Sequence, residues 1–289
     1  MQGILLSGGA GTRLWPVTIS TSKQLLPIYD KPLIFYPLST LILSGVTEIV
    51  LITSPEGLHA HQKLLGDGKQ FGIDIKYAVQ EKPTGLPDAF NVARDFLDNS
   101  KPCNLVLGDN FFYGTGLGQN LFSEVPEDSA ICFAYEVADP ENFGVVEFDK
   151  DSKVKALIEK PKTFVSNSAI PGLYRFPSSV FEIAARLKMS ERGETEIIEL
   201  LSYYLSEFKL IVREMPRGTA WLDTGTPNGM LQASQFVSIL QDRQGLLVGS
   251  PDEVAWRKEL ISDDQLRTNA QLYRFSSYGK SLLRLLEGN

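Results

Sequence analysis

The clearest chemical signal in the sequence lies near its start, in the segment SGGAGTRL at residues 7–14, which directly follows a short apolar run. Its three glycines have no Cβ atoms, so backbone N–H groups there can approach a polyphosphate closely. The arginine adds a guanidinium that can bind phosphate through two hydrogen bonds. We predict a phosphate-binding loop, with a strand-to-helix turn that binds nothing as the alternative. Its predicted nucleotide-binding residues are Gly8, Gly9, Gly11, Thr12 and Arg13.

Two familiar phosphate motifs do not fit this sequence. A dinucleotide fingerprint starting at Gly9 needs a third glycine where Leu14 stands, which argues against hydride transfer. A P-loop needs a glycine five residues before its Gly-Lys-Ser/Thr triplet. The only such triplet here begins at Gly279, and the residue five positions before it is Arg274. The phosphate loop at residues 7–14 therefore belongs to another class.

A second cation and two acidic residues complete a possible metal-nucleotide site. Lys23 in SKQLLP can face Arg13 across bound phosphates, and its alternative is a solvated surface lysine. Asp109 in LVLGDN and Asp223 in AWLDTGT stand at separate predicted strand ends. Proteins bind Mg²⁺ through one or two carboxylates plus water and phosphate oxygens. Each aspartate alone is more often a turn or cap residue, but together with the glycine loop they predict a Mg²⁺ site.

Two glutamines can select a pyrimidine base. Thymine and uracil present an N–H donor between carbonyl acceptors, and a glutamine amide supplies the complementary acceptor and donor. One glutamine stands in SKQLLP and the other in QEKPTG, which follows a predicted strand and leads into a predicted helix. The predicted base-binding residues are Gln24, Gln80, Pro83 and Gly85.

Segments from residue 110 onward can form a hexose site. The hydroxyls of a hexose need paired donors and acceptors, and a lysine in the segment EKP can reach a sugar phosphate. A charged turn is the alternative for EKP. The predicted sugar-binding residues are Asn110, Gly144, Glu159, Lys160, Ile170 and Gly172.

The order and spacing of GAGTRL and the following KQLLP resemble the signature of the sugar nucleotidyltransferases. The resemblance extends over nearly the whole chain and, through IYDKPLIFYPLSTL and WLDTGT, is closest to the glucose-1-phosphate thymidylyltransferase branch. It implies Mg²⁺-dependent attack of α-D-glucose 1-phosphate on the α-phosphorus of dTTP, which yields dTDP-glucose and pyrophosphate for dTDP-rhamnose or related deoxysugar synthesis. It also implies a homotetramer with a regulatory dTDP-sugar site involving the C-terminal helices, near residues 246–256.

Three dipeptides depart from the pattern of this branch. Pro87-Asp88 stands where Ala-Gln is more usual, Asn142-Phe143 where an Arg-Tyr pair is common, and Ile170-Pro171 where Val-Thr is usual. An amino-hexose 1-phosphate therefore remains an alternative to glucose 1-phosphate. UTP remains an alternative to dTTP because no residue in the sequence plainly excludes a ribose 2′-hydroxyl. A glycosyltransferase that consumes nucleotide sugars and a nucleotide-sugar sensor are the alternatives from other classes.

The chain has only two histidines, His59 and His61, on a predicted helix. Residues two apart on a helix point in different directions, so we expect solvated side chains rather than a metal site.

The implied reaction needs no general base, because a sugar phosphate is already ionised near neutral pH. Positioning and cations must then supply the rate, and the predicted catalytic residues are Arg13, Lys23 and Lys160.

The elements that position these residues alternate between short apolar runs and amphipathic stretches. This pattern predicts an α/β fold: a Rossmann-like, mostly parallel mixed sheet flanked by helices, with a small β insertion and C-terminal helices. A hairpin should turn near residues 150–152. We expect one domain with a nucleotide-binding part (1–130), a sugar-binding part (131–226) and a helical C-terminal part (227–289). The predicted strands are 3–6, 48–53, 73–79, 104–107 and 210–215, and the predicted helices are 33–43, 86–97, 178–189, 196–208, 227–244 and most of 253–286.

Composition limits the possible partners. The chain has 289 residues, is 43% hydrophobic and carries a formal charge of -7, which argues against a nucleic-acid-binding surface. Nowhere do 18 apolar residues run together, and no basic segment leads into a long apolar run at the start, so we expect a cytoplasmic protein without membrane contact. Cys103 and Cys132 should be buried free thiols.

Overall fold

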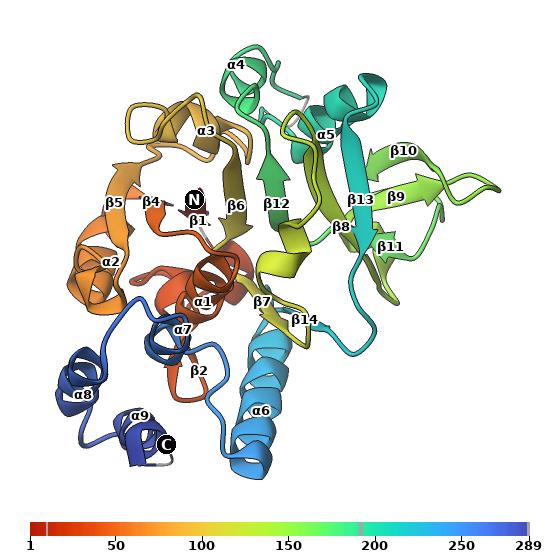
Figure 1. Ribbon diagram of the computed structural model, residues 1–289. Helices are drawn as coiled ribbons and strands as arrows, with labels where there is room; N and C mark the ends of the chain where they lie inside the picture. The colour runs from red at the N-terminus through yellow and green to blue at the C-terminus, as the bar shows by residue number, and fades with distance from the viewer. Residues whose placement is uncertain (10, 191–192, 288–289) are drawn as a thin grey trace.

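The computed structural model describes residues 1–9, 11–190 and 193–287, so that Ala10 in the glycine loop lies outside the described residues. Its centre is a ten-stranded mixed sheet with helices on both faces (Figure 1). The predicted α/β class is therefore confirmed. No helix in the described ranges is both long enough and apolar enough to cross a membrane.

The first part of the sheet is parallel, in the order β6-β1-β4-β5. All six residues of β1 are buried because its alternate side chains enter two different cores. Ile4 and Leu6 pack in the core that contains α3, whereas Leu5 packs in the core that contains α1. These elements are β1 (Gln2–Ser7), α1 (Phe35–Leu43), β4 (Glu48–Thr53), α2 (Leu58–Leu65), β5 (Asp74–Val79), α3 (Asp88–Ala93) and β6 (Cys103–Leu107).

The predicted small β insertion lies between residues 130 and 176, and its strands continue this sheet. β12 lies antiparallel between β6 and β8, and β13 runs parallel to β8 at its other side. β9 and β10 form the predicted hairpin, which is closed by a hydrogen bond from Asp149 N to Lys153 O of 2.8 Å. The elements are β8 (Ala130–Glu136), β9 (Gly144–Phe148), β10 (Val154–Glu159), β11 (Ser168–Ala169), β12 (Leu173–Phe176), α4 (Val180–Ala184), α5 (Ile197–Ser206) and β13 (Leu210–Glu214).

Two short strand pairs lie outside the main sheet. β7 (Asn110–Tyr113) pairs with β14 (Ala220–Asp223) so that Asp223 lies opposite Asn110. β2 (Pro27–Ile28) pairs with β3 (Lys31–Pro32) in a tight turn. Short 3₁₀ turns are η1 (Thr12–Leu14), η2 (Lys23–Leu25), η3 (Pro55–Gly57), η4 (Lys69–Phe71), η5 (Gln119–Phe122) and η6 (Pro140–Asn142).

The C-terminal helices have clear start signals. The hydroxyl of Thr226 accepts a hydrogen bond from Gly229 N, and Pro227 stands in the first turn, so α6 (Pro227–Gln244) begins where the sequence predicts. The serines before α7 (Pro251–Arg257) and α8 (Asp263–Leu272) cap those helices in the same way. The last helix is α9 (Ser277–Glu287). The helical structure predicted over most of residues 253–286 is therefore divided among α7, α8 and α9.

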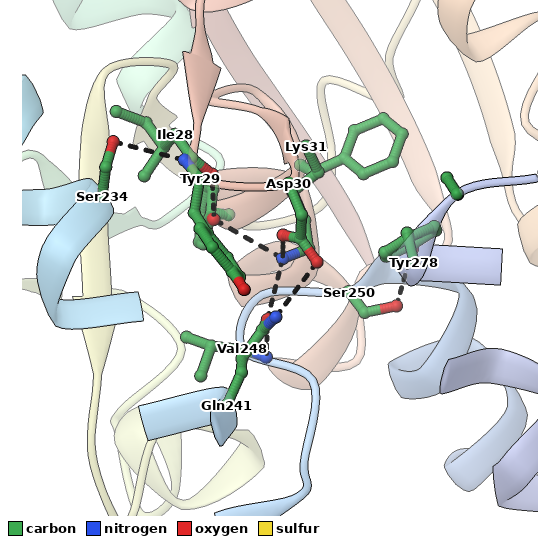
Figure 2. A network of polar contacts seen from close by, with 12 residues as sticks. Ile28, Tyr29, Asp30, Lys31, Ser234, Gln241, Val248, Ser250 and Tyr278 are labelled. Atoms are coloured by element: carbon green, nitrogen blue, oxygen red, sulfur yellow. Dashed lines mark hydrogen bonds and ion pairs between the residues drawn. The ribbon is translucent and has the colours of Figure 1, made fainter. Parts of the chain in front are cut away.

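A buried polar network fastens the turn between β2 and β3 to α6 and to the segment before α7 (Figure 2). Lys31 is only 3% exposed, and its Nζ lies 2.5 Å from Asp30 Oδ1 and 3.0 Å from Gln241 Oε1. The amide of Gln241 donates to Asp30 Oδ2, while its oxygen accepts from Val248 N. Burial lowers the pKa of Lys31, and the charge of Asp30 opposes that shift.

We expect Lys31→Met to lower the free energy of unfolding by about 3 kcal/mol, because it leaves the Asp30 carboxylate buried without its partner charge. Urea unfolding of both proteins measures this loss. Lys69→Met is the matched control, since Lys69 forms an exposed pair with Asp74 at 3.4 Å. Equal unfolding midpoints for the two variants would show that the network does not stabilise the fold.

Candidate active site

Three cavities share residues at the carboxyl ends of the parallel strands, and Asp109 lines all of them. The glycine loop follows β1, Gln80 follows β5 and Asp109 comes two residues after β6. In open α/β sheets, ligands bind at this edge. Each predicted site residue lines at least one of these cavities. We name the cavities after the ligand groups predicted for them: the phosphate cavity (250 Å³), the base cavity (240 Å³) and the sugar cavity (280 Å³).

The phosphate cavity is formed by the glycine loop. Gly9 and Gly11 have φ angles of 100° and 59°, in the left-handed region that favours glycine. The hydroxyl of Thr18 donates to Gly11 O at 2.8 Å and so holds the loop in place. The predicted residues that line this cavity are Gly8, Gly9, Gly11, Thr12, Arg13, Lys23, Gln24 and Asp109.

A buried histidine anchors the start of this loop. His61 Nδ1 lies 2.8 Å from Gly57 O and therefore donates to it, so Nε2 accepts the hydroxyl of Ser7 at 2.7 Å. His59 is exposed as expected, but the prediction that His61 is solvated was wrong. His61 lies on the face of α2 that packs toward β1, and burial lowers its pKa.

The buried histidine should make stability depend on pH. Because the pKa of His61 is lower in the folded state, the unfolded state binds more protons, and stability falls as pH drops below about 6.5. The slope for one group is at most about 1.4 kcal/mol per pH unit. Urea unfolding at pH 7 and pH 5 should show a larger loss for the native chain than for His61→Gln. His59→Gln, at the exposed position, should retain the native loss; equal losses in all three proteins would refute this role.

An ion pair joins the phosphate cavity to the sugar cavity. Lys23 is 7% exposed, and its Nζ lies 2.9 Å from Asp109 Oδ2. Asn110 Nδ2 donates to the other carboxylate oxygen at 3.0 Å. Burial opposes ionisation of Asp109, but the charge of Lys23 and these hydrogen bonds outweigh it and lower the pKa of the carboxyl. Asp109 is therefore ionised at neutral pH.

The second aspartate lies beside the first because β14 pairs with β7. Thr224 Oγ1 donates to Asp109 O at 2.8 Å, and Gly225 N donates to Asp223 Oδ1 at 2.8 Å. Both carboxylates line the sugar cavity. The described residues contain no cluster of three or more histidine, cysteine, aspartate or glutamate side chains suited to hold a metal. Two carboxylates suit Mg²⁺, which takes its other ligands from water and phosphate.

The base cavity is lined by Gln80, Pro83 and Gly85 together with the glycine loop. Gly85 has a φ of 109°, and a Cβ there would lie 2.1 Å from Thr195 O, so only glycine fits. Gln24 lines this cavity too, but its amide is engaged within the protein. Its Nε2 donates to Gly8 O at 3.1 Å and its Oε1 accepts from Ser22 at 2.6 Å.

Every residue predicted to bind the sugar lines the sugar cavity. Asn110 Oδ1 accepts from Gly172 N at 2.9 Å and from Trp221 Nε1 at 2.8 Å, so this amide oxygen organises the cavity wall. At Gly144, a Cβ would lie 3.1 Å from Glu159 Oε2. Its predicted residues are Asn110, Gly144, Glu159, Lys160, Ile170 and Gly172.

Several lining residues escaped the sequence analysis. Trp221 packs against Phe143, with ring centroids 5.0 Å apart, and the conspicuous WLD segment was the one available signal for it. Leu86 and Leu107 lie in predicted elements, but a leucine there gives no sign of ligand contact. The missed residues include Leu86, Leu107, Tyr174, Glu194, Thr195, Glu196 and Ile198.

Comparisons of the sequence with known proteins identify the family of this chain. A model of the family described as "Nucleotidyl transferase" matches residues 2–239. Glucose-1-phosphate thymidylyltransferases from Mycolicibacterium smegmatis and Neisseria meningitidis are 52% and 46% identical to this chain, each over 99% of it, and the alignments cover 99% and 100% of those proteins.

Two solved structures resemble this chain, one in name and fold and the other in fold alone. A Bacillus anthracis structure described as a glucose-1-phosphate thymidylyltransferase has a TM-score of 0.74 and 34% identity, over 82% of this chain and 94% of that one. A UDP-glucose pyrophosphorylase shares the fold, with a TM-score of 0.72, 22% identity and coverage of 82% and 98%. The chain therefore belongs to the nucleotidyl transferase family and, within it, to the glucose-1-phosphate thymidylyltransferases.

Proposed function

We propose that this chain joins α-D-glucose 1-phosphate to dTTP and releases pyrophosphate and dTDP-glucose. The observation that carries the proposal is the position of Asp109, which borders the phosphate, base and sugar cavities at once. A nucleotide and a sugar phosphate bound in these cavities would meet at that carboxylate. The names of the relatives support the same pair of substrates.

The reaction needs alignment and charge neutralisation rather than a base. A phosphate oxygen of the sugar phosphate forms a bond to the α-phosphorus, and the bond from that phosphorus to the bridging oxygen of pyrophosphate breaks. We assign Arg13 and the glycine loop to the triphosphate. Lys23 and Lys160 act on the phosphate groups at the reacting centre, where both reactants are anions.

Asp109 and Asp223 are the residues we assign to Mg²⁺. Carboxylate oxygens match its preference, and few protein ligands are needed because phosphate and water fill the remaining positions. Bound there, the ion would neutralise charge on the triphosphate. Lys23 keeps Asp109 ionised and in place.

The proposed reaction has a place in metabolism and a proposed regulation. The product would feed dTDP-rhamnose or related deoxysugar synthesis in the cytoplasm. We further propose one domain divided into the parts 1–130, 131–226 and 227–289, a homotetrameric assembly, and feedback by a dTDP-sugar bound near the C-terminal helices. Adding dTDP-rhamnose to an activity assay would test the feedback.

A pyrophosphate-release assay across nucleoside triphosphates and sugar 1-phosphates tests the activity. We expect the highest kcat/KM with dTTP and glucose 1-phosphate. Preference for UTP or an amino-hexose 1-phosphate would replace these substrates with the corresponding alternatives. Release of a nucleoside diphosphate from a nucleotide sugar would indicate a glycosyltransferase, and binding without turnover a sensor.

A further inference from the structure

Asp88 begins α3, and its carboxylate organises the loop that follows β5. Asp88 Oδ2 accepts from Gln80 Nε2 at 3.1 Å and from the hydroxyl of Thr84. Its other oxygen accepts from Asn91 Nδ2 at 3.2 Å. Gln80 Nε2 also lies 3.1 Å from Thr84 Oγ1 and 3.4 Å from Gly85 O. The amide nitrogen of Gln80 is therefore surrounded by acceptors.

These acceptors decide which way the Gln80 amide faces. Turning the amide over would place Gln80 Oε1 against the Asp88 carboxylate and the Gly85 carbonyl, which offer no hydrogen to it. The hydroxyl of Thr84 cannot compensate, because it already donates to Asp88. Gln80 Oε1 must therefore face away from Asp88.

The free side of the amide faces the base cavity. A Cβ built on Gly8 would lie 3.5 Å from Gln80 Oε1, so this oxygen lies next to the glycine loop. Gly8 and Gln80 both line the base cavity. The cavity is thereby presented with a hydrogen-bond acceptor whose position is fixed from behind.

We propose that Asp88 is a positioning residue that locks the Gln80 amide with its oxygen toward the base and so favours thymine or uracil over cytosine. Thymine and uracil carry an N–H at N3, which can donate to Gln80 Oε1. Cytosine has an acceptor at N3, which would oppose it. This inference rests on the proposed function, because it assigns the base cavity to the nucleotide.

The ionisation of Asp88 supports the lock. Burial opposes ionisation of Asp88, but the hydrogen bonds from Thr84, Gln80 and Asn91 outweigh it and lower the pKa of the carboxyl, so that it only accepts hydrogen bonds at neutral pH. A carboxylate enforces one orientation of Gln80, whereas an amide permits two.

Asp88→Asn tests the proposal with little change of shape. The asparagine can rotate to donate to Gln80, so the Gln80 amide is free to turn over. We expect the ratio of kcat/KM for dTTP to that for dCTP to fall about tenfold, the effect of one hydrogen bond. The ratio of dTTP to dUTP should stay unchanged, since these bases share the N3 donor. Asp95→Asn removes an exposed carboxylate from the turn after α3 and should change neither ratio.

Binding measurements separate this proposal from the proposed function. Calorimetry with dTTP and dCTP in the absence of sugar phosphate should show the same tenfold loss of selectivity in Asp88→Asn, with an unchanged thermal midpoint and an unchanged KM for glucose 1-phosphate. Unaltered selectivity in a folded, active variant would overturn the role of Asp88 alone. If the native chain neither binds dTTP nor uses it, the proposed function fails, and this inference fails with it.

Discussion

Lys23→Ala should lower kcat/KM for dTTP and glucose 1-phosphate at least about a hundredfold, equivalent to roughly 3 kcal/mol of barrier. Lys23 is buried, and its ammonium lies 2.9 Å from Asp109 where the phosphate and sugar cavities meet. A fixed cation at that point can neutralise the charge of two anionic reactants without reorganising. Alanine removes this charge and leaves Asp109 without its partner.

Steady-state kinetics and thermal unfolding together measure this effect. The unfolding curve establishes that the variant is folded, so that lost activity can be assigned to the site. Lys150→Ala is the control, because Lys150 is an exposed lysine in the turn between β9 and β10. Turnover by Lys23→Ala within a few-fold of the native rate would remove Lys23 from the mechanism.

Asp223→Asn should reduce kcat/KM by a similar factor, about two orders of magnitude, and raise the Mg²⁺ concentration needed for half-maximal rate. The substitution keeps the size of the side chain but removes its charge. Asp223 tests the metal assignment more cleanly than Asp109, which also pairs with Lys23.

A binding readout completes this test. The affinity of the native chain for dTTP, measured by calorimetry, should rise when Mg²⁺ is added, and Asp223→Asn should lose most of that increase. Asp242→Asn, at an exposed position on α6, should retain it. The same Mg²⁺ dependence in all three proteins would exclude Asp223 as a metal ligand.

The parts of the fold that were predicted correctly are those marked by signals close together in the sequence. Pro227 opens α6, and Gly245 with a φ of 68° closes it, so both ends of that helix are marked in the sequence. The glycine loop was recognisable because its residues are adjacent and directly follow β1. The predicted helix over residues 86–97 was too long, because α3 already ends at Ala93.

The features that escaped prediction depend on contacts between distant segments. β7 and β14 have four residues each, too few for a periodic pattern, yet their pairing brings Asp223 beside Asn110. The hydrogen bond from Trp221 to Asn110 joins residues 111 positions apart. The burial of His61 likewise depends on how α2 packs against the sheet.

Side-chain partners were the least predictable part of the site. Residue type suggested that Gln24 and Gln80 could both read a base. In the folded chain, Gln24 holds the carbonyl of Gly8, whereas Gln80 is held by Asp88 with its oxygen next to the base cavity. Which amide is free for a ligand depends on neighbours that a motif does not reveal.

The most direct test of the active site is a crystal structure with dTTP and Mn²⁺ in place of Mg²⁺, because Mn²⁺ can be located by its anomalous scattering. We predict one strong metal peak in contact with the carboxylates of Asp109 and Asp223 and with the nucleotide, whose phosphates contact Arg13 and the glycine loop. A nucleotide bound elsewhere, or a metal that touches neither carboxylate, would contradict the assignment of this site.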